Sequence, residues 1–192
     1  MSKNICLWSM PRNVSTALMY SFSQRLDTKV FDEVLYAYYL NFSGLYHPGR
    51  DKIIESLGIN SKTIIHEITS STNVSINFYK LMTHFLKGIN INFLEKVYNI
   101  IFIRDPIEVI VSYSKVISSP TIQDIGIKMQ YELYSYLNRR KIPVLILDSK
   151  YLLADPELIL NKLCDKLEIP FDKNMLNWPK GPKKEDGCWA IY

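Results

Sequence analysis

The apolar run Ile5–Trp8 (ICLW) and the loop Ser9–Thr16 (SMPRNVST) that follows it decide the fold of this chain. An uninterrupted apolar run of this length is typical of a buried strand in a parallel sheet. Val14, Leu18 and Phe22 then recur every fourth residue, which predicts a helix docked on that sheet. The pattern therefore predicts a strand, a tight loop and a helix, which together form the first half of a βαβ unit.

Further strand-like runs alternate with helical segments along the chain. They are short and rich in β-branched residues, and we expect strands at Ile64–Ile65, Ile76–Tyr79, Asn99–Ile103 and Pro143–Leu147. A later helix is expected over Ile122–Leu137, where apolar residues recur at helical spacing. This alternation predicts an α/β fold with a central parallel β-sheet flanked by helices.

Two Asp-Pro pairs mark the starts of other helices. In Asp105-Pro106-Ile107-Glu108, aspartate occupies the N-cap and proline the first helical position, and Glu108 is expected to bond back to the N-cap amide. Asp155-Pro156 repeats the first part of this signal. We therefore expect each pair to begin a helix.

The composition indicates one compact domain spanning residues 1–192, because 47% of the residues are hydrophobic and 22% are charged. Proline, glycine and lysine accumulate near the end, so residues from about 172 to 192 are expected to be irregular. The first residues resemble no secretory signal, and no run approaches the roughly 20 apolar residues of a membrane span. We therefore expect a cytoplasmic protein without a membrane partner.

The charge and the cysteines exclude other classes of site. The net charge of +4 suits anionic ligands, but no nucleic-acid-binding motif accompanies it, so no nucleic-acid partner is expected. The three cysteines are widely spaced and separate from the histidines, which argues against a disulfide framework or a zinc site. We therefore expect no metal.

The loop Ser9–Thr16 has the properties of an anion site. Its residues are small or polar with one cation, and the free backbone amides at a helix N-terminus bind anions. Arg12 can add a forked hydrogen bond to a phosphate or sulfonate, and Ser15 and Thr16 can donate from the first turn. The alternative is an ordinary connection in which Ser15 or Asn13 only caps the helix. The Gly-x-x-x-x-Gly-Lys pattern of an ATP or GTP P-loop is absent.

A second candidate anion site follows the run Asn99–Ile103. Arg104 comes at the carboxyl end of that predicted strand, where open α/β sheets place their ligands. Ser112 lies two helical turns beyond Asp105 and hence on the N-cap face of the predicted helix. Arg104 and Ser112 could therefore grip one phosphate together. Taken singly, Arg104 is better explained by a salt bridge to a neighbouring carboxylate and Ser112 by a plain serine on the helix surface.

The two sites together resemble a known family. A strand followed by Pro-Arg-x-x-Ser-Thr, and a later strand ending in Arg-Asp-Pro with Ser112-Tyr113 beyond it, are similar to the two phosphate motifs of sulfotransferases that use 3′-phosphoadenosine 5′-phosphosulfate (PAPS). The resemblance extends to a bacterial sulfotransferase-like group through Asn77–His84, Leu147–Lys150 and the tail Trp178–Ala190. It implies a three-layer P-loop-type fold.

The resemblance also implies roles for these residues. The 5′-phosphosulfate would be held by Pro11, Arg12, Asn13, Val14, Ser15 and Thr16. The 3′-phosphate would be held by Arg104 and Ser112. The implied function is transfer of a sulfuryl group from PAPS to a hydroxyl or amine of a small-molecule acceptor, and PAPS is the co-substrate.

The catalytic residues implied are His84, Lys80 and Arg12. His84 suits the base that takes the acceptor's proton, and Arg12 or Lys80 suits the stabilisation of charge on the leaving phosphate. His66 is the rival base, with Glu67 beside it, although neighbouring residues on a strand point to opposite faces. A cluster of tyrosines and Phe42 between Tyr36 and Tyr46 could line the acceptor pocket or simply pack.

The chain departs from the family near its end. Sulfotransferases usually close the site with a later Gly-rich segment bearing Lys or Arg, whereas this sequence stops at Tyr192. We expect either a truncated form, or that Lys180, Lys183 and Lys184 replace this lid, or a weaker hold on the 3′-phosphate. The alternative functions are an inactive protein that binds PAPS or its product adenosine 3′,5′-bisphosphate (PAP), and a small P-loop kinase. A homodimer is left open.

Overall fold

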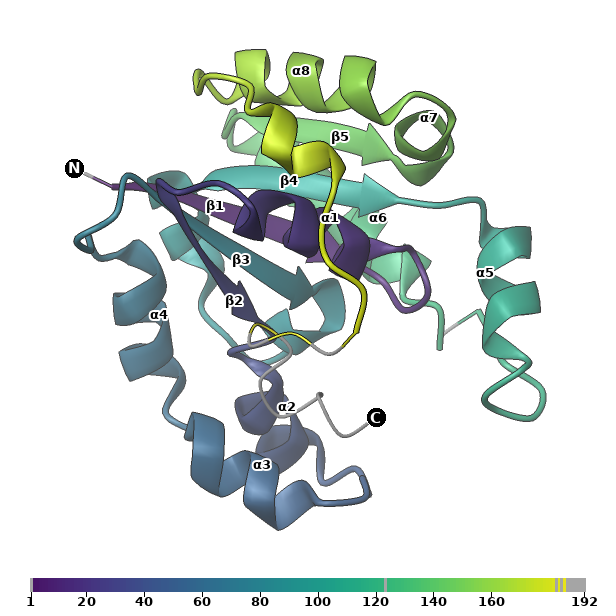
Figure 1. Cartoon of the computed structure of the whole chain (residues 1–192). Helices are drawn as coiled ribbons and strands as arrows, with labels where there is room; N and C mark the ends of the chain where they lie inside the picture. Colours follow the sequence, from purple (N-terminus) through teal and green to yellow (C-terminus); the bar gives the residue numbers. More distant parts are fainter. Residues whose placement is uncertain (1, 123, 182, 184, 186–192) are drawn as a thin grey trace.

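The computed structural model describes residues 2–122, 124–181, 183 and 185 (Figure 1). Its centre is a five-stranded sheet in the order β2-β3-β1-β4-β5, in which every neighbouring pair is parallel. The strands are β1 Lys3–Ser9, β2 Thr28–Asp32, β3 Ile76–Met82, β4 Tyr98–Ile103 and β5 Val144–Asp148. The predicted α/β fold with a central parallel sheet is therefore confirmed.

Helices connect the strands and cover the sheet (Figure 1). The α-helices are α1 Ser15–Ser23, α2 Tyr36–Ser43, α3 Arg50–Leu57, α4 Ser61–Thr69, α5 Pro106–Tyr113, α6 Ile127–Arg139, α7 Ser149–Ala154 and α8 Pro156–Lys166. Short 3₁₀ helices are η1 Thr83–Leu86, η2 Ile91–Lys96 and η3 Lys173–Leu176. The strands β1 and β4 lie side by side, so the loops that follow them meet at the carboxyl edge of the sheet.

Alternate residues of the strands feed two cores, one on each side of the sheet. Ile5 and Leu7 pack with α1, α7 and α8, whereas Cys6 and Trp8 pack with α2, α4 and α6. All four side chains of this strand are fully buried. The alternation follows from the two-residue period of a strand and produces the three layers that the family resemblance implies.

One predicted strand is wrong and one strand was not predicted. Ile64–Ile65 lies in α4, because Ile64 and Ile68 are buried on one helical face and the Asn60 side chain caps the helix at the amides of Lys62 and Thr63. The strand β2 was not predicted because its five residues include the charged Lys29 and Asp32. A short edge strand of this kind carries little apolar signal.

The helices after β4 differ in detail from the predictions. Helix α6 begins at Ile127 rather than near Ile122, because Gly126 adopts a left-handed conformation with φ 72° and ends the preceding turn. Asp105 caps α5 as predicted, accepting a bond from the amide of Ile107. Glu108 does not complete the predicted capping box, since its carboxylate pairs with Arg104 instead.

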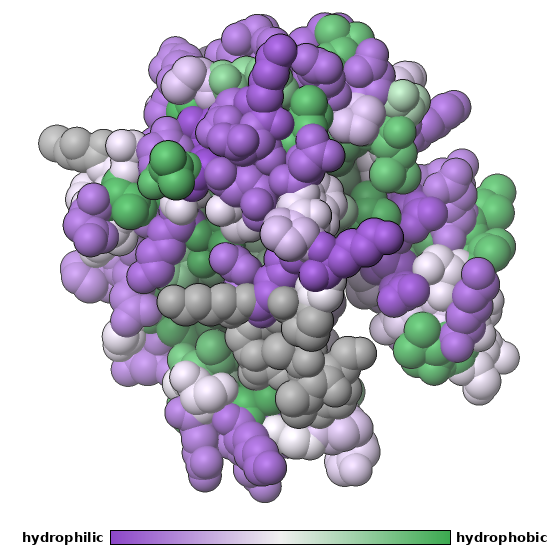
Figure 2. Space-filling model, in the orientation of Figure 1, coloured by the Kyte–Doolittle hydropathy of each residue, from purple (hydrophilic) through white to green (hydrophobic). Residues whose placement is uncertain are grey.

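Helix α5 stands away from the two main cores. Figure 2 shows hydrophobic atoms at the outer margin of the lobe at the right, where α5 lies in Figure 1. Ile107 is 71% exposed and Val111 is 56% exposed, while Val109 packs with Met10 and Ile125 in a small separate cluster. Apolar packing alone therefore holds α5 weakly, and its polar contacts gain importance. In the described part of the chain, no helix has the length and apolar character needed to cross a membrane.

Candidate active site

The loop between β1 and α1 is bent by residues with unusual backbone angles. Arg12 and Val14 have positive φ values of 62° and 59°. This conformation is uncommon for residues other than glycine, and for a β-branched residue such as valine it is strained. Left-handed residues that alternate with residues of negative φ can curl a loop so that its amides point inward, as in anion-binding nests. The loop thus reaches without glycine a shape that usually requires it.

The first amides of α1 have no side-chain cap. Val14 occupies the N-cap position and makes no side-chain hydrogen bond to the helix, so the sequence-based alternative that Asn13 or Ser15 caps α1 is wrong. The first turn of a helix leaves backbone amides without intrahelical partners, and the helix dipole favours an anion beside them. Ser15 is buried and Thr16 is exposed at this end. The geometry is that of an anion-binding helix start.

The two predicted anion motifs lie against each other. The Nε of Arg12 donates to the hydroxyl of Ser112 at 3.0 Å, which joins the first loop to α5. The Nη1 of Arg104 donates to the backbone carbonyl of Arg12 at 2.6 Å. Residues about a hundred positions apart therefore meet at the carboxyl ends of β1 and β4. Pro11 lies in the same loop and is half-buried.

Arg104 is also engaged with a carboxylate on its own segment. Its Nε lies 2.9 Å from Glu108, one helical turn further on, and the Glu108 side chain is 55% exposed. The salt bridge that the sequence allowed as an alternative for Arg104 is therefore present. Exposed pairs of this kind contribute little to stability, so an anion of higher charge could compete for the guanidinium.

Asn13 turns its side chain away from the helix start and toward β4. Its Nδ2 donates to the carbonyl of Phe102 at 2.8 Å, and the residue is 1% exposed. The same carbonyl accepts from Nε2 of Gln130, at 2.9 Å. Asn13 therefore anchors the loop to β4, a role that the sequence motif alone does not reveal.

His84 lies in η1, directly after β3 and close to the loop. Its neighbour Thr83 donates to the carbonyl of Ser9 at 3.0 Å, which fixes η1 to the start of the loop. Burial lowers the pKa of His84 to about 4. The rings of Tyr39 and Phe85 contact the imidazole, with centroids at 4.9 and 4.7 Å. The imidazole is thus neutral near pH 7.

His66, the rival base, lies elsewhere. It is exposed on α4 rather than on a strand, so the argument about strand faces does not apply to it. Helix α4 packs beside η2, and the surface next to His66 is lined by Lys62, Ile89 and Asn92. None of the loop residues reaches this surface. The structure therefore groups His84, and not His66, with the anion loop.

Lys80 is held in a buried ion-pair cluster that the sequence did not predict. Its ammonium lies 2.8 Å from Asp32 and 2.6 Å from Glu33, and the three side chains are less than one tenth exposed. Burial acts to lower the pKa of Lys80, but the carboxylates of Glu33 and Asp32 outweigh it and raise the pKa. Both acids stand at the end of β2, and Glu33 has a positive φ of 49°. The missed strand is the reason that these acids were missed.

Tyr39 of α2 and Tyr113 of α5 lie close enough to influence each other electrostatically. Burial and the neighbouring Tyr113 raise the pKa of Tyr39. The pKa of Tyr113 is raised by burial and by Asp124, while Arg12 opposes the shift. Of the aromatic cluster on α2, Tyr36 and Tyr39 contact the ring of Phe85. The loop, η1, α2 and α5 therefore surround one polar and aromatic region.

The segment after η3 passes α1. Trp178 contacts the ring of Tyr20 edge to face at 6.1 Å, and the ammonium of Lys183 lies 5.2 Å from the centre of the same ring. An apolar pocket of about 120 Å³ opens between α1, α7 and this segment, lined by residues that include Val14, Ala17, Leu153 and Trp178. Lys180 is exposed, and Lys184 lies outside the described residues.

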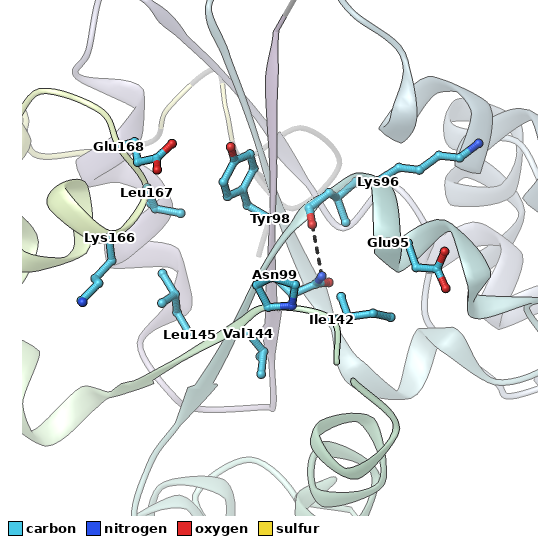
Figure 3. A pocket seen from close by; sticks show the side chains of 12 residues that line it. Glu95, Lys96, Tyr98, Asn99, Ile142, Val144, Leu145, Lys166, Leu167 and Glu168 are labelled. Carbon is cyan, nitrogen blue, oxygen red and sulfur yellow. Dashed lines mark hydrogen bonds between the residues drawn. The ribbon is translucent and has the colours of Figure 1, made fainter. Parts of the chain in front are cut away.

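A pocket of about 630 Å³ lies at the opposite edge of the sheet (Figure 3). It is formed where β4 and β5 begin, and the side chains of Tyr98, Leu145, Lys166 and Glu168 line it. Ligands of open α/β sheets bind at the carboxyl ends of the strands, whereas this pocket lies at the amino ends. None of the predicted site residues is part of its lining. Among the described residues, no group of His, Cys, Asp or Glu could hold a metal ion.

Comparison with curated proteins relates the chain to plant sequences. It is 37% identical over 189 residues to the branched-chain-amino-acid aminotransferase-like protein 1 of Arabidopsis thaliana, covering 96% of this chain and 34% of the relative. The chain thus spans about a third of the length of the curated relatives it matches.

Solved structures share the fold. The sulfotransferase domain from the curacin biosynthetic pathway superposes with a TM-score of 0.66 at 15% identity, covering 99% of this chain and 82% of that one. A mouse sulfotransferase complexed with PAP has a TM-score of 0.50 at 11% identity, covering 91% of this chain and 61% of that one. The sulfotransferase domain family matches residues 3–192. The chain therefore belongs to the sulfotransferase domain family.

Proposed function

We propose that this protein transfers a sulfuryl group from PAPS to a hydroxyl or amine of a small-molecule acceptor. The observation that carries the proposal is the junction of the two anion motifs, in which Arg104 bonds the backbone of Arg12 and Arg12 bonds Ser112. Two arginines at adjacent strand ends suit a ligand with phosphates at both its 5′ and 3′ positions. The PAP in the mouse structure of the same fold is such a ligand.

The proposed donor site uses groups that are already in place. The uncapped amides of α1 and the Arg12 guanidinium would hold the 5′-phosphosulfate, and Arg104 with Ser112 would hold the 3′-phosphate. The apolar pocket of about 120 Å³ beside Val14 and Ala17 would receive the adenine ring. This pocket borders the first turn of α1, so a base could lie there while its 5′ group meets the loop.

The transfer step needs few further groups. The acceptor oxygen or nitrogen attacks the sulfur, the bond between sulfur and the 5′-phosphate oxygen breaks, and PAP leaves with the electron pair. His84 would take the acceptor's proton, because burial keeps its imidazole neutral and Thr83 fixes η1 to the loop. Arg12 would neutralise charge on the leaving phosphate. The ammonium of Lys80 is paired with Asp32 and Glu33, so we assign the stabilisation of the leaving phosphate to Arg12 before Lys80.

The test of this proposal is transfer of label from ³⁵S-labelled PAPS to a panel of small alcohols, phenols and amines. A labelled product that disappears in Arg12→Ala and falls strongly in His84→Gln supports it. Binding of PAP without any labelled product would leave a nucleotide-binding protein and contradict the transfer. The aminotransferase-like name of the plant relatives motivates no proposal, because this chain spans only 34% of the first of them.

A further inference from the structure

Gln130 joins the ends of the two strands that carry the candidate donor site. It lies in the first turns of α6 and is 3% exposed. Its Nε2 donates to the carbonyl of Trp8 at 3.1 Å and to the carbonyl of Phe102 at 2.9 Å. Trp8 is the last residue of β1 that pairs with β4, so Gln130 bridges the strands where their ladder ends.

Asn13 meets the same carbonyl from the loop. Its Nδ2 bonds Phe102 at 2.8 Å, so one backbone oxygen accepts from the loop and from α6 together. Arg104 follows Phe102 by two residues, and Arg12 precedes Asn13. The Gln130 bridge and the Asn13 bond, together the carbonyl clamp, therefore tie the backbone of each anion-binding arginine to one point.

Within the described part of the chain, the carbonyl clamp leaves two buried amide oxygens without hydrogen-bond partners, which lowers stability. The oxygens Asn13 Oδ1 and Gln130 Oε1 are buried and have no hydrogen-bond partner among the described residues. A buried amide oxygen without a donor is destabilising, and native proteins contain few of them. An apolar side chain in place of Gln130 would avoid this cost. The two bonds that the Gln130 amide donates therefore offset this cost.

Apolar packing holds the Arg104 segment weakly, so it depends on polar links, among them the Arg104 bond to the Arg12 carbonyl and the Arg12 bond to Ser112. Helix α5 has much of its apolar surface exposed, and Val109 is its only fully buried residue within the described chain. The distance between the two guanidinium groups thus depends on polar cross-links between the loop and β4. A displacement of about 1 Å between the two guanidinium groups weakens the binding of a ligand that must contact both groups at once.

We infer that Gln130 is a positioning residue that sets the spacing between the 5′-phosphate and 3′-phosphate sites without touching the nucleotide. The inference rests on the proposed function, since it assigns Gln130 a part in recognising the second phosphate. Replacing Gln130 should therefore weaken the binding of ligands that contact both phosphate sites. It should change little the binding of ligands that contact only the loop.

The test compares PAP with 5′-AMP, which lacks the 3′-phosphate, by calorimetric titration of the whole chain. In Gln130→Met, which keeps the side-chain volume and removes both donors, the preference for PAP over AMP is expected to fall about fivefold to tenfold, while AMP binding stays nearly constant. Leu133→Ala is the matched control, because Leu133 is a buried residue one turn further along α6. It should lower the melting temperature and leave the preference unchanged.

These measurements distinguish a failure of the positioning role from a failure of the proposed function. An unchanged preference in Gln130→Met, or an equal loss in Leu133→Ala, overturns the positioning role and leaves the proposed function intact. Failure of the unmodified protein to bind PAP overturns both. Should Gln130→Met not fold, Gln130→Asn decides: it keeps the amide but is one methylene too short to reach both carbonyls, and an unchanged preference there contradicts the inference.

Discussion

The guanidinium of Arg104 donates to the backbone carbonyl of Arg12 at 2.6 Å, across 92 positions of sequence. This bond joins the carboxyl ends of β1 and β4, which are neighbours in the sheet. The loop after β1 and the segment after β4 thus form one surface that carries two positive groups, the guanidinium groups of Arg12 and Arg104. The proposed binding of PAPS depends on that surface.

Removal of the Glu108 carboxylate should strengthen binding of a 3′-phosphorylated nucleotide. Glu108 lies 2.9 Å from the Nε of Arg104 and would repel a phosphate at the same guanidinium. We expect Glu108→Gln to tighten PAP binding roughly twofold to fivefold in low salt, with a smaller effect at high ionic strength. Titration calorimetry at two salt concentrations measures this. Weaker PAP binding in the variant would show that Glu108 serves to orient Arg104 instead.

Lys80 should be needed for stability as well as for any role at the site. Lys80→Met leaves Asp32 and Glu33 buried without their cation, and breaking a buried pair costs about 3–5 kcal/mol. Denaturant unfolding should show a loss of this size. Adding Asp32→Asn and Glu33→Gln to Lys80→Met removes the stranded charges and should restore much of the loss. A single variant as stable as the parent would contradict the buried cluster.

The His84 imidazole predicts a specific pH dependence of stability. Its folded pKa of about 4 lies below the unfolded value near 6.5, so the unfolded chain binds more protons between these values. The contribution of His84 is therefore fully present above pH 6.5 and is lost as pH falls toward 4. We expect about 2 kcal/mol to be lost from pH 7 to pH 5 through this residue. His84→Gln should remove that part of the slope, and an identical slope in the variant would argue against a buried neutral imidazole.

Catalysis should follow the same titration. A base with a pKa of about 4 is ready throughout the neutral range, so the rate should stay flat from pH 8 to pH 6 and fall only at lower pH. A rate that falls with a midpoint near 6.5 would point to a different, exposed base.

The apolar pocket beside α1 should contribute to the binding of adenine and not to the binding of phosphate. Ala17→Leu places a larger side chain in the pocket of about 120 Å³ without touching Arg12 or Arg104. We expect it to weaken AMP and PAP by a similar factor, roughly tenfold, because both carry adenine. Inorganic pyrophosphate binding, measured as competition, should stay constant. Unchanged nucleotide affinity would place the base elsewhere.

The sequence predicts the parts of this site that depend on local patterns. Apolar runs and Asp-Pro pairs carry strong signals. They predict the strand before Arg12, the loop and the Asp105 cap from the sequence. The short edge strand β2 was not predicted, since two of its five residues are charged. Its omission concealed Asp32 and Glu33, the partners of Lys80.

Contacts between distant segments were beyond the sequence. The Asn13 side chain reads as a helix cap, yet it reaches β4, because Val14 takes the N-cap position in a left-handed conformation. Glu108 reads as part of a capping box, yet the nearer guanidinium of Arg104 attracts it. Gln130 carries no motif at all. The partners of Asn13 and Gln130 are set by the packing of β1 against β4, which one sequence does not encode locally, whereas Arg104 and Glu108 form a local pair one helical turn apart.

The most direct test of the central claim is calorimetric titration of the protein and its arginine variants with PAP and with AMP. The account predicts that PAP binds more tightly than AMP. Arg104→Ala should lose that preference while AMP binding persists, and Arg12→Ala should weaken both ligands roughly 10-fold to 100-fold. The exposed Arg139→Ala should change neither. Equal affinity for PAP and AMP in the unmodified protein, or full PAP affinity in Arg104→Ala, would contradict it.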